Sequence, residues 1–176
     1  MVVLDADVLP LPGTLEAVAS AAAGGHIVTG KVLRSDGRLD AVGGTVFNDG
    51  STALIGAGSV DVNGPWHEFR RPVCIAVGIV AATAGVWSAV GPLAGPGDAE
   101  SVREWCGTAW TSGRPVIYEP AVRVVRLTDG GALDAAVPAS SPWARLSALR
   151  PARPPEFSDG AWRYVMAHDD VEACRG

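Results

Sequence analysis

Residues 2–13 read VVLDADVLPLPG: an apolar run, two acids separated by one residue, and a turn rich in proline and glycine. The apolar run predicts a buried β-strand that ends at the acids. Side chains two positions apart in a strand project to the same side, so Asp5 and Asp7 can direct their carboxylates at one volume. Hard divalent ions prefer oxygen ligands, and open α/β sheets bind ligands beyond the carboxyl ends of their strands. The pattern therefore favours a cation site, although acids beside a turn are also often solvated or cap the next helix.

Helical and strand patterns alternate through the rest of residues 14–127. Apolar residues recur at helical spacing from Thr14 until Gly24 and Gly25 end the pattern. Further helices are predicted at 82–90 and 99–112, strands at 26–33, 73–80, 115–118 and 121–127, and an antiparallel excursion at 39–47. The interleaving predicts an α/β fold with a mixed sheet.

The longest uncharged run in the sequence is residues 72–97. It is long enough to suggest a membrane-spanning helix, and a small membrane-anchored protein is one interpretation. However, the run is mostly alanine, glycine and valine, and Gly78, Gly85, Gly91 and Pro92 divide it into short pieces. We therefore expect a buried strand followed by a short buried helix.

Composition and length limit the class of protein. The chain has 176 residues, 48% of them hydrophobic and 19% charged, which is typical of one folded domain. Its formal net charge of -5 argues against a nucleic-acid partner. We assign residues 1–130 to the domain and residues 131–176 to a tail rich in proline, alanine and arginine, with a short docking helix near 157–167.

Cysteine usage and the first residues bear on location. The three cysteines are odd in number and lack the spacing of a zinc site, which favours a reducing compartment. The first residues carry acids where a secretory signal has basic residues. We expect a cytoplasmic protein, with the inner face of the membrane as the other option.

Several motifs resemble the family 2 glycosyltransferases, which are inverting nucleotide-sugar enzymes with the GT-A fold. Leu4-Asp-Ala-Asp-Val8 and the residues after it resemble the family's L-[ND]-x-D-x-x-P-x-P-G-x-L segment. Gly30-Lys-Val-Leu33 and Asp36-Gly-Arg-Leu39 are similar to P-K-L-L and D-G-x-[LI]. Residues 73–93, with Gly78 and then Val90-Gly-Pro-Leu93, are similar to the strand, S-G-A turn and helix ending in V-G-G-F that line the acceptor side. Gly113-Arg-Pro-Val-Ile-Tyr-Glu-Pro120 resembles G-x-x-V-x-Y-x-P.

The resemblance covers about residues 2–127 and implies a fold, a reaction and a metal. The fold would be the C-terminal part of a GT-A-like three-layer α/β fold with a mixed β-sheet. The reaction would be inverting transfer of a sugar from a nucleotide-sugar donor to a hydroxyl of a glycan or lipid-linked acceptor. Asp5 and Asp7 would be the metal-binding aspartates of the D-x-D motif, holding Mn²⁺ or Mg²⁺ against the leaving diphosphate.

The resemblance also implies a catalytic base, taken from an acidic helix that precedes the G-x-x-V-x-Y-x-P motif. Asp98 and Glu100 match it if this helix is one turn longer than usual, whereas an ungapped alignment leaves Glu104. Capping of the helix amino terminus is an alternative role for Asp98 and Glu100. A histidine that often follows the motif is replaced by Arg126, which cannot ligate a metal and can instead meet phosphate.

The family places a nucleotide-binding half before the D-x-D strand, whereas this sequence starts almost on that strand. From the resemblance we expect one of three situations. The chain is a fragment of a longer protein, or it needs a partner chain that supplies the missing half, or it is a non-catalytic remnant that binds a partner.

Overall fold

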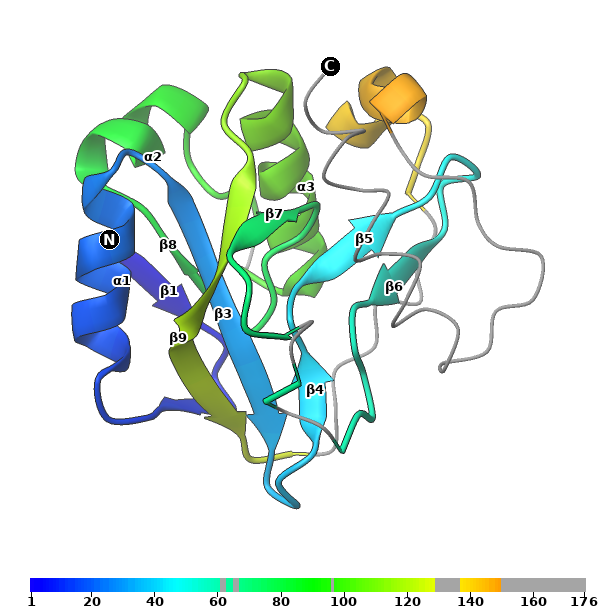
Figure 1. Ribbon diagram of the computed structural model, residues 1–176. Coiled ribbons are helices and arrows are strands. Elements are labelled where there is room, and N and C mark those ends of the chain that lie inside the picture. The colour runs from blue at the N-terminus through cyan, green and yellow to red at the C-terminus, as the bar shows by residue number, and fades with distance from the viewer. Residues whose placement is uncertain (61–62, 65–66, 96, 129–136, 150–176) are drawn as a thin grey trace.

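The computed structural model describes residues 1–60, 63–64, 67–95, 97–128 and 137–149 (Figure 1). It is a mixed α/β structure with a sheet of parallel and antiparallel strands. The helices are α1 (Thr14–Ala23), α2 (Ala84–Val90), α3 (Ala99–Thr111) and the 3₁₀ segment η2 (Pro142–Leu149). The strands are β1 (Val2–Leu4), β2 (Val8–Pro10), β3 (Ile27–Arg34), β4 (Leu39–Ala41), β5 (Gly44–Val46), β6 (Thr52–Leu54), β7 (Arg71–Val73), β8 (Ile79–Ala81) and β9 (Val116–Arg126).

The main sheet is built around strands β3 and β9, which run parallel to each other (Figure 1). The strand order is β1-β8-β3-β9-β2, with β4 also paired to β3 and β7 also paired to β9. The other pairings described for this sheet are antiparallel. Strands β5 and β6 form a separate antiparallel pair. Because β9 reaches β2 at one end, it brings Arg126 opposite Val8, next to the predicted acids.

Strand β9 is continuous where the sequence predicted two strands. The register against β3 shifts between Thr29 and Lys31, so that residues 119–122 lie opposite Gly30 in a bulge. Pro120 falls in this bulge, where its missing N–H removes no ladder hydrogen bond. A Cβ atom on Gly30 would collide with the backbone of Val122. Glycine therefore allows β9 to approach β3 at this point.

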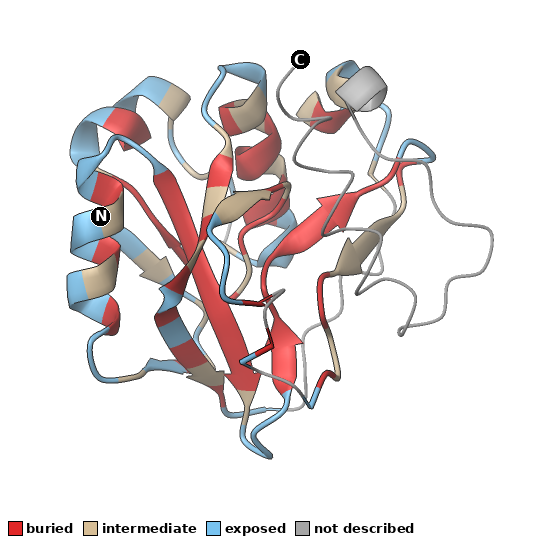
Figure 2. Ribbon diagram, viewed as in Figure 1, coloured by how far each residue is buried: buried red, intermediate tan, exposed pale blue. Residues whose placement is uncertain are grey.

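Helices cover both faces of the sheet. Alternate side chains of β3 face opposite ways, and β3 is buried along nearly its whole length (Figure 2). On one face, Val28 and Val32 pack with Val18 and Ala22 of α1. On the other face, Ile27 and Leu33 belong to the apolar cluster that includes residues of α2 and α3. Helix α1 begins and ends where the sequence predicted, between Gly13 and Gly24.

The apolar run of residues 72–97 folds as short elements of the domain. It contains the end of β7, all of β8 and the seven-residue helix α2. The strand predicted at 73–80 is divided in the structure: Val73 ends β7, Ile75 forms an isolated bridge with Gly44, and β8 begins at Ile79 after Gly78, which has a φ of 72°. Within the described part of the chain, no helix combines the length and the apolar character that crossing a bilayer requires.

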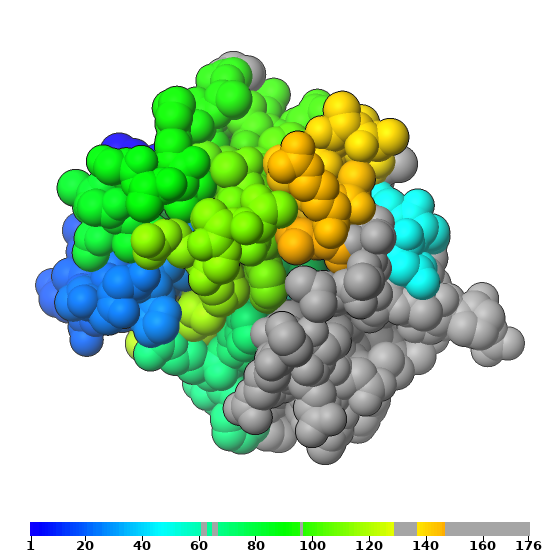
Figure 3. All heavy atoms as spheres, turned by 90° about the horizontal axis from the view of Figure 1, so that it is seen from above, coloured from blue at the N-terminus to red at the C-terminus, as the bar shows by residue number. Residues whose placement is uncertain are grey.

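Two further segments differ from the predictions. Strand β1 was expected to be buried, but it lies at the edge of the sheet and leaves Val2 and Leu4 exposed by 39% and 38%. Segment η2 packs against α3 (Figure 3), and its Trp143 is buried and donates a hydrogen bond to the carbonyl oxygen of Arg103 at 2.9 Å. The helix predicted near 157–167 lies outside the described residues.

Candidate functional site

The two acids predicted to converge lie in the turn between β1 and β2. The amide of Asp5 donates to the carbonyl oxygen of Gly78 at 3.0 Å, which ties the turn to the chain leading into β8. A Cβ atom on Gly78 would come within 2.8 Å of Val32, so glycine lets this segment lie close to β3. The carboxylates of Asp5 and Asp7 reach the same group, as the sequence predicted, but that group is an arginine.

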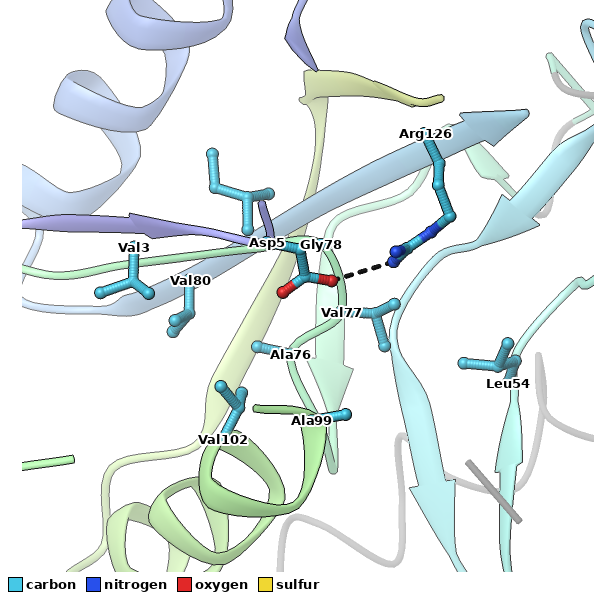
Figure 4. Close-up of a pocket in the computed structure, with 11 residues that line it drawn as sticks. Val3, Asp5, Leu54, Ala76, Val77, Gly78, Val80, Ala99, Val102 and Arg126 are labelled. Carbon is cyan, nitrogen blue, oxygen red and sulfur yellow. Dashed lines mark hydrogen bonds and ion pairs between the residues drawn. The ribbon is translucent and has the colours of Figure 1, made fainter. Parts of the chain in front are cut away.

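The guanidinium of Arg126 contacts three aspartates, one through each of its nitrogens. Nη2 donates to Asp5 Oδ2 at 3.0 Å (Figure 4), and Nη1 donates to both oxygens of Asp7 at 2.8 and 3.0 Å. Nε donates to Asp40 Oδ2 at 2.9 Å. The sequence suggested phosphate as one partner for Arg126; the partners that the structure gives it are carboxylates. We call Asp5, Asp7, Asp40 and Arg126 the aspartate–arginine cluster.

Burial differs strongly within the aspartate–arginine cluster. The side chains of Arg126 and Asp40 are 7% and 4% exposed, while those of Asp7 and Asp5 are 27% and 36% exposed. Burial alone would raise the pKa of Asp7, but hydrogen bonds from Thr128 and Arg126 outweigh it and lower the pKa below 3.8. Burial likewise opposes the charge on Arg126, but its hydrogen bonds to the three aspartates raise the pKa. Both groups are therefore charged at neutral pH.

Asp40 was not among the predicted site residues. It lies in β4 between buried Leu39 and Ala41. An acid inside an apolar strand pattern is a sign of a buried partner, because an isolated buried charge is costly. The sequence contains that sign, but it does not identify Arg126 as the partner.

A pocket with a volume of about 90 Å³ borders the aspartate–arginine cluster (Figure 4). Its walls come from β1, from the chain entering β8, from β6 and from the first turns of α3. The described lining residues are Val3, Asp5, Leu54, Ala76, Val77, Gly78, Ile79, Val80, Ala99, Val102 and Arg126. Asp5 and Arg126 are the charged groups in this set, and the remaining wall is apolar. Only Oδ2 of Asp5 is bound to Arg126, and its other oxygen lies on the pocket side in Figure 4.

The donor set does not fit a divalent metal while Arg126 is in place. Three of the four carboxylate oxygens of Asp5 and Asp7 accept hydrogen bonds from the guanidinium, and one of the Asp7 oxygens also accepts one from Thr128. A dication beside these oxygens would also stand next to a buried positive charge. Among the described residues, no group of three or more His, Cys, Asp or Glu side chains is arranged to hold a metal ion.

The predicted catalytic acids lie at the start of α3. Asp98 is the N-cap residue, and its Oδ1 accepts hydrogen bonds from the amide and hydroxyl of Ser101 at 2.8 and 2.7 Å. The bond from the Ser101 amide is the main reason that the pKa of Asp98 is lowered. Glu100 and Glu104 both pair with buried Arg103, at 3.4 and 3.2 Å. The capping alternative thus describes what Asp98 does in the structure.

The structure brings some of the predicted residues together and leaves others apart. Asp5 and Asp7 share Arg126, and Asp98 is adjacent in sequence to Ala99, which lines the pocket. Glu100 is instead directed to Arg103, and its side chain is 68% exposed. No protein-family model matches the sequence, and no curated protein matches it.

Proposed function

We propose that this chain is a glycosyltransferase-like domain, which performs inverting transfer of a sugar from a nucleotide-sugar donor to an acceptor hydroxyl at the pocket beside Asp5. The observation that supports the proposal is the pocket itself. Three segments of the family resemblance border it: the D-x-D turn with Asp5, the chain from Ala76 to Val80, and the start of α3 at Ala99. These segments are far apart in sequence, so their meeting at one pocket is not a consequence of local structure.

The chemistry would be a single in-line displacement at the anomeric carbon. The acceptor oxygen forms the new bond to that carbon, the bond to the diphosphate oxygen breaks, and the hydroxyl proton goes to a carboxylate. The pocket-side oxygen of Asp5 is suited to accept a hydrogen bond from a hydroxyl of the donor sugar and so to orient the donor. Asp98 is the proposed base, and since Ser101 occupies its Oδ1, the proton would be received at Oδ2.

Donor binding by the full chain tests this proposal. Saturation-transfer NMR would be recorded with UDP-, GDP- and dTDP-linked hexoses and with the Asp5→Ala and Glu16→Ala variants. We expect magnetisation to be transferred to one of the donors from the natural chain and also from Glu16→Ala, because Glu16 lies on α1 at the opposite face of the sheet. The signal should be lost in Asp5→Ala. If no donor is saturated at millimolar concentration, the proposal is wrong.

A non-catalytic, partner-binding domain is the second candidate. It is favoured by a specific observation: the acids of the predicted site have partners within the protein. Asp5 and Asp7 pair with Arg126, Asp98 caps α3, and Glu100 pairs with Arg103. Asp98→Ala removes the cap of α3 and should lower the thermal stability under either candidate, whereas under this candidate no donor binds. Under the first candidate, Asp98→Ala leaves donor saturation intact while abolishing transfer.

A further inference from the structure

Three carboxylates from separate parts of the chain surround one cation in this protein. Asp5 and Asp7 come from the turn after β1, Asp40 comes from β4, and Arg126 ends β9. Each guanidinium nitrogen is assigned to a different aspartate, at 2.8 to 3.0 Å. Arginine presents its donors in a rigid planar fork, so this division among three partners fixes the guanidinium in orientation as well as position.

The backbone around Arg126 holds the guanidinium in the cluster. Within β9, Arg126 is opposite Arg34 of β3 on one side and Val8 of β2 on the other. The next amide, that of Leu127, donates to the carbonyl oxygen of Asp7 at 2.8 Å. If the side chain swung away, Asp40 would remain as a buried carboxylate without this counter-charge. The cluster therefore disfavours departure of the arginine.

A metal ion and the guanidinium require the same oxygens. A Mg²⁺ ion binds carboxylate oxygens at about 2.0–2.1 Å, so an ion on Asp5 Oδ2 or on either oxygen of Asp7 would stand in the space that the guanidinium N–H groups occupy. We propose that the guanidinium of Arg126 is the cation that Asp5, Asp7 and Asp40 bind in this site. It stands where a divalent metal would be held by these aspartates, so the site does not use a metal. The inference rests on the proposed function in one respect, since the metal whose place Arg126 takes is the one that the D-x-D resemblance implies.

The proposal also defines what Arg126 does not do. One guanidinium balances one of three carboxylates, so the cluster keeps a net negative charge and does not supply the positive charge that a metal would set against a diphosphate. Arg126 is therefore a positioning residue, which holds the Asp5 turn against the pocket. In the structure the guanidinium holds the three carboxylates apart; the variant Arg126→Ala frees them to close on a smaller ion, and carboxylate oxygens are ligands that divalent ions prefer.

Mn²⁺ binding by the full-length chain tests the inference, with the loss of the free-ion electron paramagnetic resonance signal as the readout. We expect Arg126→Ala to bind Mn²⁺ at least about tenfold more tightly than the natural chain, with a Kd on the order of 10⁻⁴–10⁻³ M. Adding Asp7→Asn to that variant should remove the gain. Arg103→Ala is the matched control, because Arg103 is also buried and paired with carboxylates, those of Glu100 and Glu104, and Glu100 is 68% exposed and stays hydrated. It should gain no Mn²⁺ site.

A second measurement uses the natural chain alone and decides the question if Arg126→Ala does not fold. In ¹⁵N spectra, Mn²⁺ should not selectively broaden the amide signals of residues 5–8 and 126–127. Selective broadening of these signals overturns the inference, as does a folded Arg126→Ala that binds Mn²⁺ no better than the natural chain. Donor saturation is recorded without metal, so a chain that shows neither Mn²⁺ broadening nor donor saturation supports the inference and contradicts the proposed function.

Discussion

The substitution Asp40→Asn should lower the free energy of unfolding in the natural chain and raise it in the variant Arg126→Met. In the natural chain Asp40 is 4% exposed and accepts a charge-assisted hydrogen bond from Arg126, so Asp40→Asn should cost about 1.5–3 kcal/mol. Arg126→Met leaves Asp40 buried without this counter-charge and should cost about 3–5 kcal/mol, a large part of the stability of a typical domain. In that background Asp40→Asn removes the unpaired charge, and should therefore stabilise the protein.

The contribution of the other two aspartates to this effect should be small. Asp5 and Asp7 are 36% and 27% exposed, so water can replace the guanidinium at their oxygens. Pairs of this exposure contribute about 0–1 kcal/mol each. The expected sign reversal therefore comes from Asp40, the most buried of the three acids.

Urea unfolding of the four chains in this double-mutant cycle measures the effect, with tryptophan fluorescence and circular dichroism as probes. The matched cycle is Arg103→Met with Glu100→Gln. Arg103 is 2% exposed, but Glu100 is 68% exposed and remains hydrated when its partner is lost. This cycle should show a coupling of only about 0–1 kcal/mol and no reversal. If Asp40→Asn costs the same with and without Arg126, the ion pair does not hold the cluster and the reasoning fails.

Three further outcomes follow from the structure. Burial opposes ionisation of Asp7, but hydrogen bonding lowers its pKa below 3.8 in the folded protein. The ionised carboxylate therefore stabilises the fold above the pKa of the unfolded state, and this contribution is lost as the pH falls through the lower, folded value. Urea midpoints measured from about pH 5 to about pH 2 should depend less on pH in Asp7→Asn than in the natural chain. Gly30→Ala should lower the free energy of unfolding by about 3 kcal/mol or more, because the added Cβ would collide with the backbone of β9. At Gly85 nothing lies within 4 Å of an added Cβ, so Gly85→Ala should stabilise α2 by about 0.5–1 kcal/mol in the same unfolding assay. Trp143→Ala should cost about 3–5 kcal/mol and expose residues 137–149 to limited proteolysis; equal cleavage of the natural and variant chains would show that η2 does not depend on this side chain.

Sequence patterns predicted the helices better than the strands. The limits of α1 were predictable because Gly13 and Gly24 bound a regular apolar spacing. Strand β9 was predicted as two strands, because Pro120 interrupts the pattern and only the bulge opposite Gly30 explains how one strand accommodates it. The exposure of β1 was not predictable, since an apolar run has the same composition at the edge of a sheet as at its centre.

The candidate site could be predicted where the signal is local. The D-x-D spacing predicted that Asp5 and Asp7 reach one volume, and they do, but through the turn after β1 and not by alternation within a strand as predicted. It could not predict what occupies that volume, since Arg126 lies 119 residues from Asp7 and 86 from Asp40 in sequence. The role of Asp98 as a cap was weighed from the sequence because N-cap chemistry involves only the next few residues.

The parallel pairing of β3 with β9 has a consequence for synthesis. Strand β3 can pair with β9 only after all residues before Val116 have been synthesised. During that interval the nascent chain carries an open apolar edge that invites pairing with other chains, and closing so long a loop is slow. Production of this protein should therefore respond to chaperone supply and to slower synthesis at reduced temperature.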